Sequence, residues 1–291
     1  MLYVEKLSSI HSEVSEAVSE LFITASENQT HENDLLLIIE NGFYDEKVKE
    51  AAGNHSPFVI GPHYQHYAEM TQYEFYHLYR VTNTRKISQE EYLKSIKRTD
   101  KQKGHSIGTQ LELAIYLKLW ESNRFLERLF KLAKLCQGQI YDWHFQIGKD
   151  DSRHDLIRNQ IRNPLEYICP KFYSLIKRIY LSQIRNAVAH SQFFIVGSGI
   201  TFLNYDPQRH APIEFMPIED WETRFHYMAM MYNEYIRNLN VHNYLYQRKS
   251  RLYEDGLTLR MTELDGNDHA HNIIYDKDSK RWIWIENYKG K

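Results

Sequence analysis

The chain has 291 residues, of which 42% are hydrophobic, enough to build a packed core and to exclude disorder over most of its length. Its 36 basic and 38 acidic residues nearly cancel and leave a net charge of -2. This balance excludes a protein that coats nucleic acid with its whole surface, so any polyanion would bind at a local patch.

Features of secreted and membrane proteins are missing from the sequence. Two cysteines, Cys136 and Cys169, are too few for a disulfide framework and are typical of a reducing compartment. The longest aliphatic run, residues 35–39, is far shorter than the roughly 20 residues that cross a bilayer. The N-terminal 25 residues lack the apolar stretch of a signal peptide. We expect a cytoplasmic protein that does not enter a membrane.

The N-terminal part is predicted to be a helical extension over residues 1–62. Apolar residues at three- and four-residue spacing predict one amphipathic helix over residues 3–26. Glycine, proline and asparagine are dense over residues 41–62, which predicts an irregular connection.

A helical domain is predicted over residues 63–250, and its first helices are marked by two signals. Helical periodicity returns over residues 66–81, and the spacing of Ser88 and Glu91 is that of a capping box. Residues 85–103 hold seven basic and three acidic side chains. This segment is either a solvated face or a phosphate contact patch, for which the candidate RNA-binding residues are Lys94, Lys97, Arg98, Lys101 and Lys103.

The longest helical pattern covers residues 109–136, roughly 40 Å at 1.5 Å per residue, and would form the spine of a bundle. A second strong helix is predicted over residues 171–190. The period then changes to that of a β-hairpin over residues 192–203, and a further long helix follows over residues 218–246.

The last segment, residues 251–291, is predicted to be a small β addition with strands over residues 257–264 and 271–285. His269 and His271 stand beside two aspartates, but we place them in a polar turn and expect no bound metal. No Walker or dinucleotide-binding glycine pattern occurs, and no cofactor is expected.

The most informative string lies at the end of the predicted helix over residues 171–190: Arg185, Asn186, three further residues and His190. From 17 Arg, 17 Asn and 15 His, such a pattern is expected about 0.05 times by chance, and it occurs twice. Asn186 and His190, four residues apart, lie on one helix face, and the long side chain of Arg185 reaches toward them. The C-terminal end of a helix favours a protonated imidazole.

This string resembles the hallmark of the HEPN superfamily, helical domains of ribonucleases and toxins that carry Arg, usually Asn, three variable residues and His. The resemblance covers roughly residues 63–250. It predicts a mainly α fold, with a HEPN-like helical bundle, a β-hairpin inserted after the motif helix and the small C-terminal β addition.

What the resemblance implies is metal-independent RNA cleavage by attack of the ribose 2′-hydroxyl, which leaves a 2′,3′-cyclic phosphate. His190 would be the general acid or base, Arg185 would stabilise charge on the phosphorane, and Asn186 would orient His190 or the phosphate. Similar proteins act as homodimers with a composite cleft, and many belong to toxin–antitoxin or phage-defence systems. RNA, a second copy of the chain and an antitoxin or defence partner are therefore the expected partners.

Two alternatives concern the residues. Arg185 would pair with a surface carboxylate and His190 would only end a helix, in which case the string is structural. The second match, Arg237, Asn238 and His242, is followed by a tyrosine found in one branch of HEPN toxins, but its asparagines weaken the helix around it. We favour the first match as the catalytic one, and both matches could face one cleft.

Two alternatives concern function. A catalytically inactive HEPN-like module would bind RNA, nucleotide or protein without cleavage, which the near-neutral charge favours. A structural scaffold within a defence complex would use Arg185 and His190 only for stability.

Overall fold

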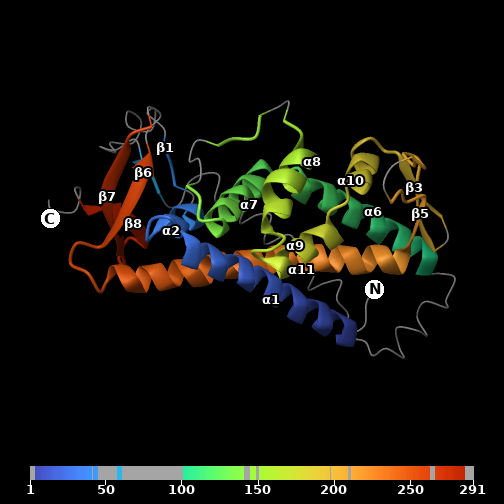
Figure 1. Cartoon of the computed structure of the whole chain (residues 1–291). Coiled ribbons are helices and arrows are strands. Elements are labelled where there is room, and N and C mark those ends of the chain that lie inside the picture. The colour runs from blue at the N-terminus through green and yellow to red at the C-terminus, as the bar shows by residue number, and fades with distance from the viewer. Residues whose placement is uncertain are drawn as a thin grey trace.

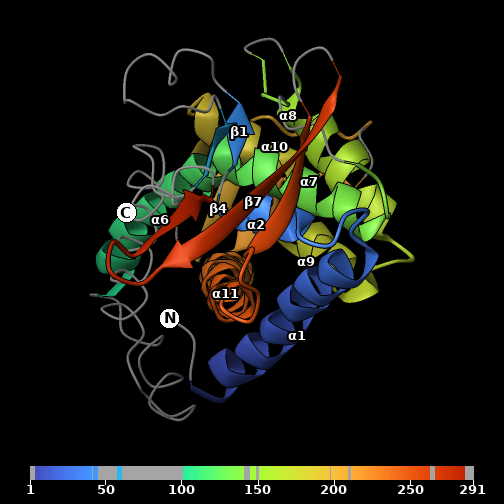
Figure 2. The ribbon, with the colours of Figure 1, turned by 90° about the vertical axis from the view of Figure 1, so that its left-hand side faces the viewer.

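The computed structural model describes residues 4–40, 42–44, 58–60, 101–140, 145–148, 151–196, 198–208, 211–262 and 266–285, and it confirms a mainly α fold. The long helix α11, Ile218–Ser250, forms its axis, with a small antiparallel sheet at each end (Figure 1). In the view along α11, α1 and α9 lie on one side of it and α6 on the other (Figure 2).

The described helices other than α11 are mostly short. Their bounds are α1 Val4–Asn28, α2 Asp34–Ile39, α6 Lys101–Trp120, α7 Asn123–Cys136, α8 Arg153–Asp155, the π-helix η1 Leu156–Arg162, the 3₁₀-helix η2 Asn163–Leu165, α9 Pro170–Ile179 and α10 Ser182–Ala189. The helix predicted over residues 66–81 and the capping box at Ser88 lie outside the described residues.

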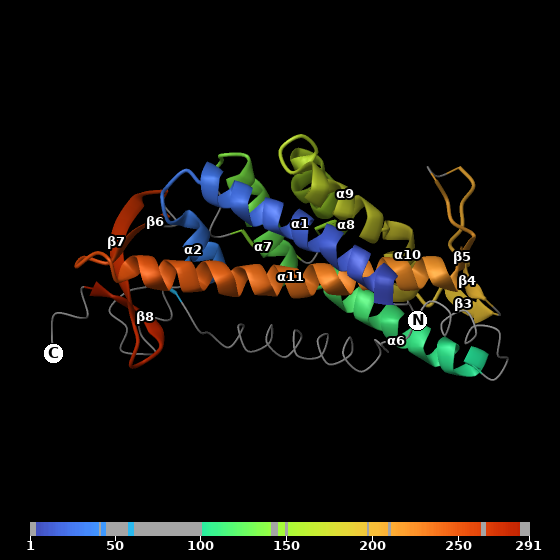
Figure 3. The ribbon, with the colours of Figure 1, turned by 90° about the horizontal axis from the view of Figure 1, so that it is seen from below.

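Helix α1 confirms the amphipathic helix predicted over residues 3–26. Its apolar stripe, which includes Ile10, Val14 and Val18, is buried against α11, α7 and α9. Figure 3 shows α1 crossing α11 at a shallow angle along much of its length. Burial of this stripe, rather than intrinsic propensity, holds such a helix in place.

The prediction of a single helix over residues 109–136 is wrong, because two helices, α6 and α7, occupy this stretch. The break falls at Glu121 and Ser122. Ser122 has an extended backbone, and its hydroxyl accepts a hydrogen bond from the backbone N–H of Phe125 at 3.5 Å. A serine in this position starts a new helix by satisfying one of its free N–H groups. The break exposes the carboxylate of Glu121 at the turn.

The sheet at the start of α11 contains the predicted hairpin and one strand more. Strands β3 (Phe193–Val196) and β4 (Gly199–Phe202) pair antiparallel, and β5 (Phe215–Pro217) pairs with β4 and leads directly into α11. Gly199 is required here, since a Cβ atom would come within 2.6 Å of the carbonyl oxygen of Met216.

The C-terminal sheet corrects the prediction of two strands. It has three antiparallel strands, β6 (Leu257–Thr262), β7 (Asp268–Asp276) and β8 (Arg281–Trp284). His269 and His271 therefore lie within β7 and not in a turn. A further two-residue pair joins β1 (Phe43–Tyr44) to β2 (Phe58–Val59).

One cluster of buried apolar side chains extends from Leu7 in α1 to Trp282 in β8. Residues of all three predicted segments therefore contribute to it. Among the helices that the structure describes, none is both long enough and apolar enough to cross a membrane.

Candidate active site

The motif helix α10 is shorter than the helix predicted over residues 171–190, because the chain breaks at Tyr180 and Leu181 between α9 and α10. The buried hydroxyl of Tyr116, on α6, holds this break. It accepts a hydrogen bond from the N–H of Leu181 at 2.9 Å and donates one to the carbonyl of Ile179 at 3.2 Å. A tertiary contact thus satisfies backbone groups at the end of one helix and the start of the next.

The other end of α10 turns sharply into β3. The N–H of Gln192 donates to the carbonyl of Ala187 at 2.7 Å, and Ser191 has a φ of 55°, the geometry of a Schellman motif. Ile184 and Ala187 are buried on the face toward α6. His190, the last residue before this turn, is exposed, and its ring makes no hydrogen bond to a described residue.

Arg185 and Asn186 lie side by side in the structure, both partly buried. The guanidinium of Arg185 donates to the side-chain oxygen of Asn186 at 2.8 Å and forms an ion pair with the carboxylate of Glu121. The same carboxylate lies 3.3 Å from Nε of Arg153. Glu121 therefore neutralises two arginines and fixes the direction of the Arg185 side chain.

The pairing of Arg185 with a carboxylate is what the structural alternative predicts, but two further cations, Arg153 and Arg162, also lie near this site. Tyr180 is buried beneath them, and burial raises its pKa to about 12, against the opposing effect of nearby Arg185 and Arg162. The ring of His154 stacks on Tyr180 with centroids 6.0 Å apart, and burial lowers the pKa of His154.

Sequence reasoning missed Glu121, Arg153 and His154. Glu121 was hidden inside a predicted continuous helix, although the serine after it is a common helix start. A signal for the neighbouring η1 helix did exist: Arg-Asn pairs recur at residues 158–159 and 162–163, four residues apart. A π-helix is itself often found near functional sites.

The second match serves helix packing. Arg237 pairs with Glu234 at 2.6 Å and also contacts α1, while the side chain of Asn238 donates to the carbonyl of Glu234 at 2.8 Å. The ring of His242 stacks on Phe22 of α1 with centroids 5.5 Å apart, and burial lowers its pKa. Its three residues share no hydrogen-bond partner with Arg185 among the described residues, so the structure does not join the two matches into one site.

The remaining predicted RNA-binding residues cannot be placed relative to this site. Lys94, Lys97 and Arg98 lie outside the described residues, and for Lys101 and Lys103 only the backbone, in α6, is described. Within the described ranges, no group of three or more His, Cys, Asp or Glu is arranged to hold a metal ion.

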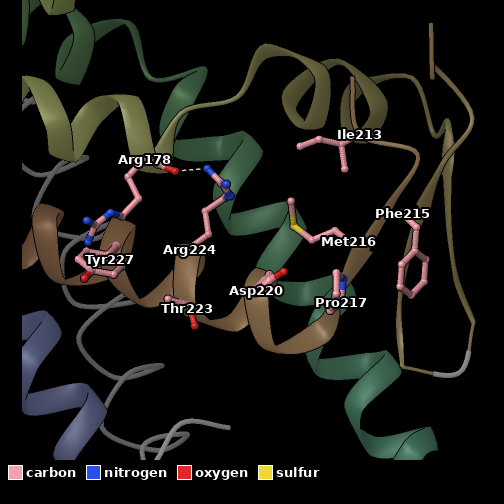
Figure 4. Close-up of a pocket in the computed structure, with 9 residues that line it drawn as sticks. All are labelled: Arg178, Ile213, Phe215, Met216, Pro217, Asp220, Thr223, Arg224 and Tyr227. Carbon is pink, nitrogen blue, oxygen red and sulfur yellow. Dashed lines mark hydrogen bonds between the residues drawn. The ribbon is translucent and has the colours of Figure 1, made fainter. Parts of the chain in front are cut away.

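A pocket of about 410 Å³ lies where β5 enters α11, and no motif residue lines it (Figure 4). Arg178 of α9 and Arg224 of α11 are among the residues that line it. Arg224 donates to the carbonyl of Arg178, whose own guanidinium lies over the ring of Tyr227 at 4.5 Å and pairs with Glu13 at 2.8 Å. Both cations are held by other residues of the fold. Because no motif residue lines the pocket, it is separate from the candidate site.

The candidate site thus comprises an exposed histidine at the end of α10 and, five residues earlier, an arginine that is held by an asparagine and a glutamate. Comparison of the chain with protein-family models, with curated protein sequences and with solved structures finds no match.

Proposed function

We propose that the protein is a metal-independent endoribonuclease of the HEPN type, acting as a homodimer in a toxin–antitoxin or phage-defence system. The observation that carries the proposal is local. Arg185 and Asn186 are hydrogen-bonded to each other in the last turns of α10, and His190 is solvent-accessible one turn further on. A fixed positive charge and an accessible imidazole are the groups that phosphate transesterification needs.

In the proposed reaction, the ribose 2′-oxygen forms a bond to the adjacent phosphorus while the bond from phosphorus to the 5′-oxygen breaks. One proton leaves the 2′-hydroxyl and one is delivered to the departing 5′-oxygen. A homodimer supplies two copies of His190, one for each proton. Arg185 stabilises the added negative charge on the phosphorane oxygens, and Asn186 fixes the guanidinium.

Glu121 gives this scheme a specific requirement. Because its carboxylate pairs with Arg185 in the free protein, a scissile phosphate must replace that carboxylate or share the guanidinium with it. The two side chains are partly exposed, at 25% and 32%, so exchange of one anion for another costs little. Arg153 remains beside Glu121 and keeps its charge compensated during the exchange.

Single-turnover cleavage of a mixed-sequence RNA in EDTA tests the proposal. His190→Ala is expected to lower the rate by at least about 100-fold, the usual contribution of a general acid or base. His242→Ala is the matched control, because it removes a histidine that packs on Phe22; it should retain the rate and lower stability alone. Equal loss of activity in both variants, with both folded, would contradict the assignment of the site.

A second candidate, a module that binds RNA without cutting it, is favoured by one observation. Nε and Nη1 of Arg185 already donate hydrogen bonds to Glu121 and Asn186, and Nη2 forms an ion pair with Glu121, an arrangement that stabilises a fold without any ligand. Salt-sensitive RNA binding by the wild-type protein, with no new RNA ends, would establish this candidate in place of the first.

A further inference from the structure

Helices η1 and α9, which precede the motif helix, carry basic side chains, and only some of these form ion pairs with described residues. On α9, Lys171 pairs with Glu16 at 2.9 Å, and Arg178 pairs with Glu13 at 2.8 Å. Lys177 of the same helix, and Arg158 and Arg162 of η1, make no ion pair with any residue that the structure describes. These three cations are therefore available to an anionic partner.

Two of them are arranged around one aromatic ring. The guanidinium of Arg162 lies 5.9 Å from the centroid of Tyr173, and Nζ of Lys177 lies 5.5 Å from it. The side-chain oxygen of Asn163 accepts from two nitrogens of Arg162, at 2.9 and 3.0 Å. Arg162 is thus fixed before any partner arrives, although burial and the charge of Arg158 lower its pKa.

The connection between η2 and α9 adds a large exposed aromatic side chain. Tyr167 is 92% exposed, and it lies five residues after Arg162 and six before Tyr173. A tyrosine this exposed contributes nothing to the core, but its ring offers a face on which a base can stack. Asp155 and Glu166 also belong to this region, so the surface is basic but not uniformly so.

Arg158 and Arg162 also lie near residues that surround the motif. The buried ring of Tyr180 lies close enough to both Arg162 and Arg185 for each guanidinium to affect its pKa. Arg158 and Arg162 likewise lower the pKa of His154, which stacks on Tyr180. Arg153, in α8 directly before η1, lies 3.3 Å from the carboxylate of Glu121, and the same carboxylate pairs with Arg185. The start of η1 therefore adjoins the motif helix α10.

We propose that Arg158, Arg162, Tyr167, Tyr173 and Lys177, here named the η1–α9 surface, bind single-stranded RNA and lead it to Arg185 and His190. The inference deepens the proposed function and depends on it for the destination of the strand. Arg158, Arg162 and Lys177 contact phosphates, Tyr173 supports two of these cations, and Tyr167 stacks on a base. An acidic peptide would satisfy the cations but leave Tyr167 without a role, and a duplex would not present unstacked bases.

Binding is measured by fluorescence anisotropy with a labelled single-stranded RNA, in EDTA and over a series of salt concentrations, with His190→Ala as the background. The double variant Arg162→Gln/Lys177→Gln should weaken binding about tenfold or more, and it should reduce the slope of log affinity against log salt by roughly 1.4, or 0.7 per lost phosphate contact. Tyr167→Ala should weaken binding about fivefold without a change in slope. Lys134→Gln is the matched control, since it removes a cation 5.4 Å from another ring, that of Phe130.

Binding of both test variants as tight as that of Lys134→Gln would overturn the proposal, and so would a duplex that competes as well as the single strand. A dinucleotide that spans only the cleaved bond separates this inference from the proposed function. The double variant, with His190 present, should cut the dinucleotide at the wild-type rate and long RNA more slowly. Weaker binding of RNA by the double variant, without cleavage by the wild-type protein, would support the surface while refuting the nuclease.

Discussion

The break between α9 and α10 sets the position of the motif helix, and the hydroxyl of Tyr116 holds this break. Removal of that hydroxyl should therefore destabilise the protein. Tyr116→Phe removes the group that accepts from the N–H of Leu181 and donates to the carbonyl of Ile179. The ring of Tyr116 remains buried between Trp120 and Trp221, so its apolar packing is kept. The variant therefore isolates the hydrogen bonds.

The expected loss follows from the two backbone groups that are left without a partner. An unsatisfied buried donor or acceptor costs about 1–3 kcal/mol, and a partly buried one costs less. Because Leu181 is only partly buried and Ile179 is buried, we expect the free energy of unfolding to fall by about 2 kcal/mol in total. The proposed activity should also fall, since α10 loses its anchor on α6.

Urea unfolding followed by circular dichroism measures this loss. Tyr253→Phe is the control, because the Tyr253 side chain is exposed and its hydroxyl makes no hydrogen bond to a described residue; its effect should stay within about 0.5 kcal/mol. If Tyr116→Phe unfolds at the same urea concentration as the control, the hydroxyl does not hold the break.

Three further predictions concern pH, packing and charge. Burial lowers the pKa of His226 to about 3 from an ordinary 6.5. Below pH 6.5, His226 therefore binds a proton in the unfolded chain but not in the folded chain. The free energy of unfolding should therefore fall as the pH drops from 6.5 toward 3, and His226→Gln should make this fall shallower in urea titrations; an unchanged slope would contradict the assignment. Gly199→Ala should cost about 1–3 kcal/mol in the same assay, because the new methyl group meets the backbone of Met216, and a loss under 0.5 kcal/mol would refute that contact. Glu121→Gln should change stability by less than about 1 kcal/mol but tighten RNA binding several-fold at low salt, because Arg185 no longer pairs with a carboxylate; unchanged affinity would show that Glu121 does not compete with phosphate.

Long elements with a clear period could be predicted from the sequence. The stripe of α1 and the helix over residues 218–246 show regular apolar spacing, and burial of these side chains in the structure follows from it. The hairpin of β3 and β4 was marked by a glycine-rich turn. The guanidinium of Arg185 was expected to reach back toward the face of Asn186 and His190, and it donates a hydrogen bond to the side-chain oxygen of Asn186.

Breaks that depend on distant contacts were not predictable from periodicity. The end of α9 is fixed by Tyr116, which lies more than 60 residues earlier in the chain, and no local breaker marks it. At Glu121, apolar spacing continues through the break, and only the cap of Ser122 signals it. The role of Glu121 depends on its approach to Arg185, which is 64 residues away, so its part in the site is a property of the fold.

The most direct test of the central claim is the chemistry of the RNA ends that the protein produces in EDTA. Purified wild-type protein and His190→Ala are incubated with the same RNA, and the products are identified by mass spectrometry. The proposal predicts 2′,3′-cyclic phosphate and 5′-hydroxyl ends with the wild-type protein and their loss with His190→Ala. The same ends at the same rate from folded His190→Ala, or ends that carry a 5′-phosphate, would contradict it.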